Sequence, residues 1–253
     1  MSLRTCADIV SVSHSHICGY VPDEVLGARV AHDRLRTAAV CSPAAAANAM
    51  NTDAAGLGLA TSDWRVVLPT LTGRQVTLRE PSASDLRPLL DLLSIGDASR
   101  FGADEPVSEL GVQRFLERVR RERAAGVAIT YVVTLSATCA VVGLAQLRQL
   151  DLSFESAEWD CTLAPSWRGT GVFLDTARLV GSFAFGVVGA RRLEARVPLR
   201  NGRANGALRK LGAVQEGVLR QSVRRGDTYL DQVLWSVLKE DWGEHWVFTA
   251  RVH

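Results

Sequence analysis

A short glycine-rich segment at residues 167–173 lies between two apolar runs, and it constrains the fold more than any other feature of the chain. The run at residues 159–163 has the character of a strand, and the run from residue 173 to about residue 188 has that of a helix. Amides in the first turn of a helix have no intrahelical partner, glycines allow close approach to the backbone, and the helix dipole favours an anion. Arg168 adds a fixed positive charge at the mouth of this turn. The sequence therefore predicts an enzyme that holds a phosphate-bearing cofactor.

The composition is that of a globular protein, with 47% hydrophobic and 22% charged residues among 253. A formal net charge of only +2 gives no strong field for nucleic acid, so we expect no nucleic-acid partner. Five arginines at residues 114–123 alternate with Glu117 and Glu122, which is more typical of a solvated helix face than of a nucleic-acid site. No uninterrupted apolar run reaches the ~18 residues of a membrane span, so we expect no membrane association.

The cysteines and histidines give little evidence for disulfides or metals. Five scattered cysteines without a CxxC pair indicate a reducing compartment, and the cytoplasm is the expected location. His14, His16 and Cys18 have no second ligand pair at zinc-finger spacing, so no metal site is predicted.

Residues 1–60 differ from the rest of the chain. They are rich in small residues and show neither a helical nor a strand period, which predicts a poorly ordered N-terminal extension. Patterns typical of strands and helices begin at about Trp64, so residues 61–253 are predicted to form the folded domain.

Regular elements are indicated along this domain. Ser84 with Asp85, and separately Ser108, are predicted to start two helices, the second of which ends at Gly126. A further short helix is expected at residues 201–211. The predicted strands are residues 76–79, 129–135, 141–150, 157–163 and 193–197, with a hairpin of residues 214–223 and 228–238. Antiparallel runs with one crossover predict an α+β fold around a central mixed sheet.

Several segments, taken in order, carry a resemblance to a known family. Residues 168–172, RGTGV, resemble the acyl-CoA pyrophosphate loop, R-x-x-G-x-G/A, of the GNAT N-acetyltransferases. Residues 201–213 resemble the later N…A/S…KLG segment of that family. The branch that acetylates the N-terminal amine of ribosomal proteins is matched by residues 71–79, 157–159, 192–195 and 216–217. The resemblance covers about residues 64–242 and implies a GNAT-like central mixed, mostly antiparallel sheet flanked by helices.

The resemblance implies acetyl-CoA as co-substrate and suggests its contacts. The strand before the loop is expected to diverge from its neighbour, so that the cofactor arm pairs with freed backbone around Leu163. Asn201 holds the cofactor arm or caps a helix, and Lys210 either reaches the 3′-phosphate or complements the helix C-terminus in solvent. The N–H groups expected to bind the pyrophosphate belong to Arg168, Gly169, Thr170, Gly171, Val172 and Phe173.

Two positions depart from the family pattern. The last small residue of the loop is Phe173 in this chain, and its ring either crowds the cofactor or faces the helix–sheet core. Many relatives have a tyrosine seven residues after the position of Asn201 as the acid for the thiolate, whereas this chain has Leu208. Either another group protonates the sulfur or the thiolate leaves unaided, because a thiol with a pKa of ~8.5 is a tolerable leaving group.

Two carboxylates on the strand before the loop are the candidate catalytic bases. Glu158 and Asp160 point to the same side of that strand, and either can take a proton from the incoming ammonium. The alternative is a structural role, in which they pair with Arg196 or another arginine of the adjacent strand.

The function expected from these features is acetyl-CoA-dependent N-acetyl transfer, directly to a primary amine in a ternary complex. The acceptor is a protein N-terminus or a small-molecule amine. An α-amine with a pKa of ~7.8 suits a site with a weak base better than a lysine amine with a pKa of ~10.4. The alternative is a non-catalytic acyl-CoA-binding or sensing module, consistent with Phe173 and Leu208. A homodimer is also compatible with the sequence.

Overall fold

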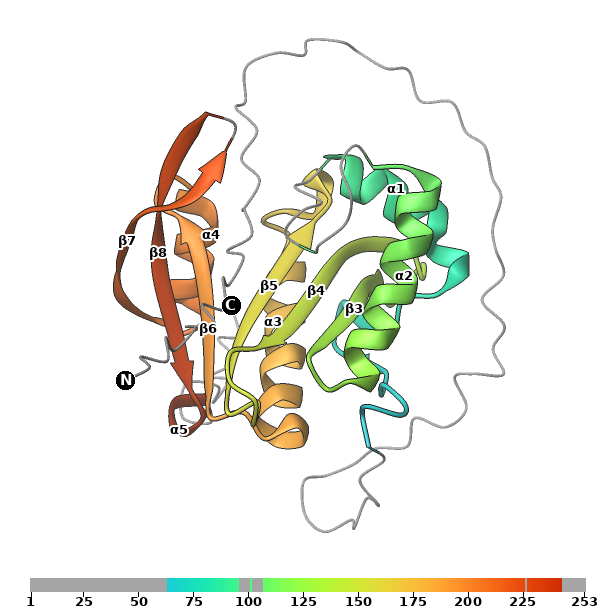
Figure 1. The fold of residues 1–253 in the computed structure, drawn as a ribbon, viewed down its shortest axis with the longest axis horizontal. Helices are drawn as coiled ribbons and strands as arrows, with labels where there is room; N and C mark the ends of the chain where they lie inside the picture. Colours follow the sequence, from blue (N-terminus) through green and yellow to red (C-terminus); the bar gives the residue numbers. More distant parts are fainter. Residues whose placement is uncertain (1–62, 96–100, 102–106, 226, 243–253) are drawn as a thin grey trace, which may run out of the picture.

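The fold is built on one eight-stranded sheet (Figure 1). The computed structural model describes residues 63–95, 101, 107–225 and 227–242, so the extension predicted at residues 1–60 lies outside the described residues. Across the sheet the strand order is β1-β2-β3-β4-β5-β6-β8-β7. The strands are β1 Leu71–Thr72, β2 Val76–Arg79, β3 Ala128–Leu135, β4 Val141–Gln149, β5 Ser156–Leu163, β6 Arg192–Pro198, β7 Val214–Arg225 and β8 Thr228–Leu238.

Helices cover both faces of this sheet. α1 and α2 pack on β3 and β4 from one side, and α3 packs on the other side (Figure 1). The helices are α1 Leu86–Ile95, α2 Glu109–Ala124, α3 Val172–Phe183, α4 Gly202–Lys210 and α5 Lys239–Trp242.

Neighbouring strands pair antiparallel everywhere except between β5 and β6. β5 and β6 are parallel, and α3 makes the crossover between them. The sheet is therefore mixed and mostly antiparallel, and the predicted α+β class is confirmed.

Alternation along β4 divides the core between the two faces. Leu144 belongs to the cluster under α1 and α2, whereas Ala145 and Leu147 belong to the cluster under α3. The partners of Leu144 and Arg148 on β5 are Thr162 and Glu158. Side chains at positions 158, 160 and 162 therefore share the α1/α2 face of the sheet, as the sequence pattern predicted.

One predicted helix cap is confirmed, and the residues predicted to form the other lie in a turn before the helix. Ser108 is the N-cap of α2, and its hydroxyl accepts a hydrogen bond from the amide of Gly111 at 3.0 Å. α1 begins at Leu86, directly after the predicted Ser84 and Asp85, but these two residues lie in a 3₁₀ turn, Ala83–Asp85, whose N-cap is Ser82. Arg79 fixes this turn by donating to both carboxylate oxygens of Asp85, at 2.6 and 2.7 Å.

The helix predicted from residue 173 to about residue 188 has two parts. α3 is α-helical to Phe183, and a π-helical turn, Ala184–Val188, continues it. Gly189 ends this turn with a φ of 91°, a left-handed conformation that glycine adopts readily.

Candidate active site

Strands β5 and β6 separate as they approach the glycine-rich segment. They pair at three positions, the last of which is Glu158 with Glu194, although β5 continues to Leu163 and β6 to Pro198. On its other side β5 keeps its ladder with β4 as far as Leu163. Beyond Glu158, the β6-facing edge of β5 therefore has no partner strand within the described residues. This is the divergence expected for a strand that pairs with a cofactor arm.

The glycine-rich segment joins the open end of β5 to α3 and is exposed around Gly169. Gly169 and Gly171 have φ angles of 86° and 92°, which other residues rarely adopt. Gly171 is the N-cap of α3, and no side chain caps the helix there. The amide of Arg168, which was predicted to bind the pyrophosphate, already donates to the carbonyl oxygen of Pro165 at 3.2 Å. Among the described residues, the six backbone amides of residues 169–174 have no hydrogen-bond partner. Together with the positive end of the helix dipole, these amides can bind an anion.

Two side-chain bonds hold this loop over the end of β5. The hydroxyl of Thr170 donates to the carbonyl oxygen of Trp167 at 2.8 Å. The exposed Arg168 turns back, and its Nε donates to the carbonyl oxygen of Leu163 at 3.0 Å. Arg168 therefore orients the loop in addition to supplying charge, and one of the Leu163 backbone groups expected to meet the cofactor arm already has a partner.

Phe173 faces the helix–sheet core. Its ring lies 5.6 Å from that of Trp159, centroid to centroid, and packs against the buried cluster under α3. Of the two alternatives for this position, the packing role is the one that the geometry supports. The loop remains exposed beside it.

Asp175, which sequence reasoning missed, ties the start of α3 to the turn between β1 and β2. The residue is 7% exposed, and its Oδ2 accepts hydrogen bonds from the amides of Gln75 at 2.8 Å and Val76 at 3.2 Å. A Cβ built on Gly73 would lie only 2.6 Å from the same oxygen. An acidic residue in the first turn of a predicted helix was the available signal, but its distant partners cannot be read from the sequence.

The candidate bases lie on the α1/α2 face where β6 diverges. Arg196 donates to Oε1 of Glu158 at 3.1 Å, so the structural pairing foreseen for Glu158 is present. Arg196 also donates to Glu194 at 3.2 Å. Within the described residues, the second oxygen of Glu158 has no partner. Asp160 lies two residues further along β5, beside the open edge.

The ion pairs continue along this face to β7. Arg192 donates to Glu194 at 2.9 Å and to both oxygens of Glu216, at 2.6 and 2.5 Å. The hydrogen bonds from Arg192 and Ser236 lower the pKa of Glu216 from 4.5 to about 2. These pairs fix the side chains around Glu158 in place.

α4 carries the other residues that the sequence singled out. Asn201 caps this helix, its side chain accepting from the amide of Ala204 at 3.1 Å, and a role with the cofactor stays a prediction. Lys210 is exposed in the last turn, where both proposed roles stay open. Asn205, not predicted, is buried; it donates to the carbonyl oxygens of Pro198 and Asn201 and accepts from the indole N–H of Trp235.

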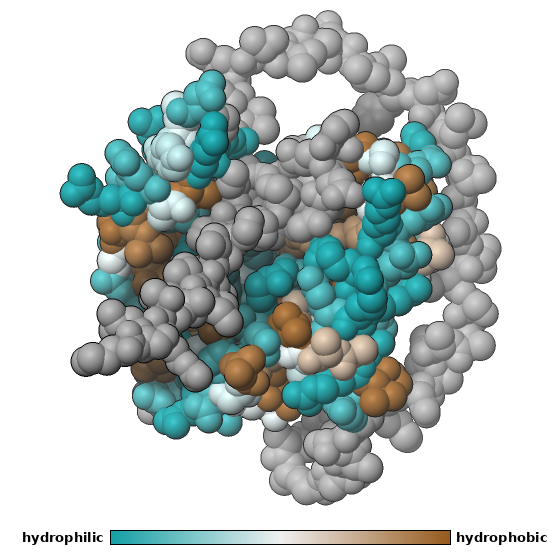
Figure 2. All heavy atoms as spheres, viewed as in Figure 1, coloured by the Kyte–Doolittle hydropathy of each residue, from teal (hydrophilic) through white to brown (hydrophobic). Residues whose placement is uncertain are grey.

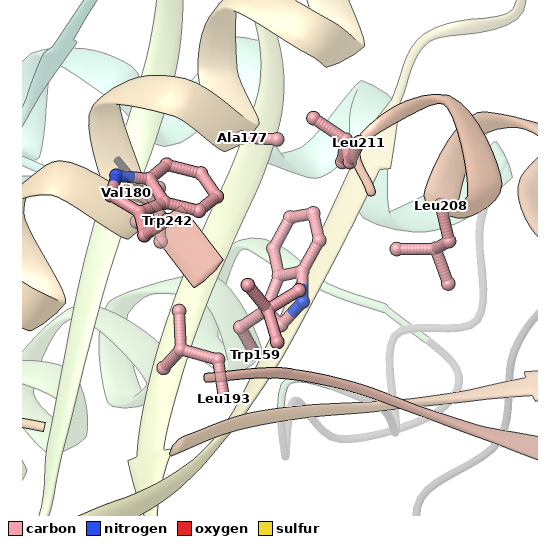
Figure 3. Close-up of a pocket in the computed structure, with 9 residues that line it drawn as sticks. Trp159, Ala177, Val180, Leu193, Leu208, Leu211 and Trp242 are labelled. Carbon is pink, nitrogen blue, oxygen red and sulfur yellow. The ribbon is translucent and has the colours of Figure 1, made fainter. Parts of the chain in front are cut away.

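Leu208 is buried and lines a small apolar cavity of about 10 Å³ between α3 and α4 (Figure 3). Trp159, Leu193 and Trp242 also line it. It has room for about one water-sized group, and its lining is mostly apolar. Position 208 therefore offers no acid to a leaving thiolate.

A larger, open pocket of about 400 Å³ lies at the same end of the sheet as the glycine-rich loop. It is formed by the end of β6, the connection to α4 and the β7–β8 hairpin, with Leu199, Arg200, Arg225, Tyr229 and Asp231 among its lining residues.

The arginine-rich face of α2 is a polar, ion-paired surface. Arg118 pairs with Glu122 at 2.7 Å and Arg123 with Glu80 at 2.9 Å. Figure 2 shows mostly hydrophilic side chains over this helix. In the part of the chain that the structure describes, no helix is long and apolar enough to cross a membrane, and no acidic, cysteine or histidine cluster is grouped to hold a metal ion.

The family follows from comparison with known proteins. A family model of the acetyltransferase (GNAT) domain matches residues 75–214, more than half of the chain, and the chain belongs to this family of acetyltransferases. Comparison with curated proteins gave no match.

Solved structures agree with this fold. RimJ of Mycobacterium smegmatis, in complex with CoA-disulfide, is 18% identical with a TM-score of 0.61, over 70% of this chain and 90% of that one. The ribosomal-protein-S5-alanine acetyltransferase of Vibrio fischeri is 16% identical with a TM-score of 0.61, over 69% and 98%. The spermidine/spermine N-acetyltransferase SpeG of Vibrio cholerae is 20% identical with a TM-score of 0.56, over 66% and 95%. At these identities, the likeness establishes the fold.

Proposed function

We propose that this protein transfers an acetyl group from acetyl-CoA directly to a primary amine. The observation that carries the proposal is the row of unpartnered amides at residues 169–174, placed where the β6-facing edge of β5 is open. The amides can cradle the diphosphate of acetyl-CoA, and the open edge can hydrogen-bond its pantetheine arm. A donor held at both places directs its thioester into the gap between the two strands.

The reaction then needs few protein groups. The neutral amine nitrogen bonds to the thioester carbon, the C–S bond breaks, and the amine gives up one proton. Glu158 or Asp160 receives that proton, directly or through a water molecule. Glu158 has one oxygen held by Arg196 and the other unpartnered within the described residues, so the bond to Arg196 orients it and leaves an oxygen available. The thiolate leaves without help from the buried, apolar Leu208.

The acceptor is a protein N-terminus or a small-molecule amine. The open pocket beside the end of β6 is a candidate site for the acceptor, because it lies at the same end of the sheet as the glycine-rich loop. Similar folds occur in proteins named for acetylating ribosomal proteins and for acetylating spermidine or spermine. An α-amine, with an ordinary pKa of ~7.8, is partly neutral at pH 7 and needs only a weak base. The cytoplasm and a homodimer remain our expectations from the sequence.

Calorimetric titration with acetyl-CoA, followed by thiol release across a panel of N-terminal peptides and polyamines, tests this function. We expect saturable binding and turnover with at least one amine. Glu158→Gln or Asp160→Asn should lower kcat by about 10²–10⁴-fold, whereas Glu117→Gln, on the exposed face of α2, should not change it.

The outcomes separate the alternatives. If the folded protein gives no heat of binding with acetyl-CoA, the proposal is refuted. Binding without turnover on any amine favours the non-catalytic acyl-CoA-binding module. Full activity in both carboxylate variants removes the two candidate bases while leaving the transferase assignment in place.

A further inference from the structure

The turn between β1 and β2 lies directly beside the glycine-rich loop, although the two are about a hundred residues apart in sequence. The side-chain amide of Gln75 faces Gly171: its Nε2 is 3.0 Å and its Oε1 3.8 Å from the position that a Cβ on residue 171 would occupy. Gln75 is exposed, and its side chain has no hydrogen-bond partner among the described residues. A polar group thus lies unengaged at the edge of the unpartnered amides.

Asp175 holds this turn in position. Its Oδ2 accepts from the backbone amides of Gln75 and Val76, and this joins the first turn of α3 to the start of β2. Gly73 closes the turn with an amide that donates to the carbonyl of Val76 at 2.8 Å. Because the backbone of Gln75 is fixed to α3, its side chain stays close to the loop. The two amide donors also offset the negative charge of Asp175 near a site for an anion.

We propose that Gln75 is a further binding residue for the diphosphate of acetyl-CoA, so that the β1–β2 turn forms a second wall of that site. This inference rests on the acetyl-CoA site proposed above. Gln75 donates one hydrogen bond from its side-chain amide to a diphosphate oxygen, and Asp175 is the positioning residue that presents it. The proposal also accounts for glycine at position 171. The residue there has a left-handed φ, and a side chain would displace the Gln75 amide.

The test compares a donor that has the diphosphate with one that lacks it. For Gln75→Ala we expect acetyl-CoA to bind about three- to tenfold more weakly by calorimetry. Gln75→Glu should weaken binding more than tenfold, since it places a negative charge beside the diphosphate. The matched control is Gln215→Glu, which adds the same charge on β7 at the opposite edge of the sheet and should leave binding unchanged. With S-acetylpantetheine, kcat/KM should be equal in wild type and all three variants.

Two results would overturn the inference. One is unchanged acetyl-CoA affinity in both Gln75 variants. The other is an equal loss with S-acetylpantetheine, which would assign Gln75 a structural role. In either case wild-type protein still binds acetyl-CoA, and the proposed function stands. If wild-type protein binds no acetyl-CoA, the proposed function and the role of Gln75 are both refuted.

Discussion

Replacing Phe173 by alanine tests whether the diphosphate loop is open in spite of this unusual aromatic residue. The ring is half-buried at the second position of α3 and packs against Trp159. The substitution therefore removes apolar contacts from the core and leaves the amides of the loop in place. We expect it to lower stability without changing the affinity for acetyl-CoA.

The size of the stability loss follows from the burial of the ring. A fully buried phenylalanine costs about 3–5 kcal/mol when truncated to alanine, so a half-buried one should cost about 2 kcal/mol. The aromatic pair with Trp159 supplies about 0.5–1.5 kcal/mol of this. For a domain of this size the loss corresponds to a fall in Tm of about 4–8 °C.

Denaturant unfolding and calorimetric titration with acetyl-CoA measure the two effects separately. Leu179→Ala is the matched control, because this side chain is also half-buried on α3 but lies two turns from the loop. Both variants should lose stability and keep wild-type affinity. A Phe173→Ala protein with wild-type stability and about tenfold tighter binding would refute the reasoning, since the ring would then obstruct the cofactor site.

Two other substitutions test contacts that hold the strands around the site in place. Gly143→Ala places a Cβ against the carbonyl oxygen of Thr162 and the side chain of Leu163, so it should displace the end of β5, lower stability by about 2 kcal/mol and weaken acetyl-CoA binding. Gly206→Ala on α4 is its control: nothing lies within 4 Å of its Cβ, and better helix propensity should stabilise the protein by up to about 1 kcal/mol. An unaffected Gly143→Ala protein would contradict the close approach of β4 and β5. Glu216→Gln should cost at most about 1 kcal/mol at pH 7, because the pair with Arg192 is solvent-exposed. Since the pKa of Glu216 falls from 4.5 to about 2 on folding, this stabilisation is complete above pH 4.5 and disappears toward pH 2. Thermal unfolding from pH 7 to pH 3 should show the difference from wild type shrinking, and a constant difference would contradict the pairing.

Local signals predicted most of the fold. The hydroxyl of Ser108 and the alternation in β6 act over a few residues, so the sequence shows them directly. The 3₁₀ turn before α1 was not predicted, because a side chain from β2, Arg79, anchors Asp85 in it. The π-helical end of α3 likewise has no period that marks it in the sequence.

The same distinction between local signals and long-range contacts holds for the residues of the site. The glycine-rich loop was predictable because its glycines mark it locally, whereas the divergence of β5 was expected only from the family resemblance. The bonds of Asp175 to the β1–β2 turn depend on segments about a hundred residues apart, and no local pattern encodes them. For Glu158, the residue types allowed both a base and a partner of Arg196, and only the register of β5 and β6 shows that the pair forms.

The central claim is that the backbone amides of residues 169–174 bind the diphosphate of acetyl-CoA. Backbone amide NMR during a titration with CoA measures this most directly. The amide protons of this stretch should shift strongly and exchange more slowly with solvent, while those of the α2 face should not change. CoA binding that leaves the signals of residues 169–174 unmoved would contradict the claim.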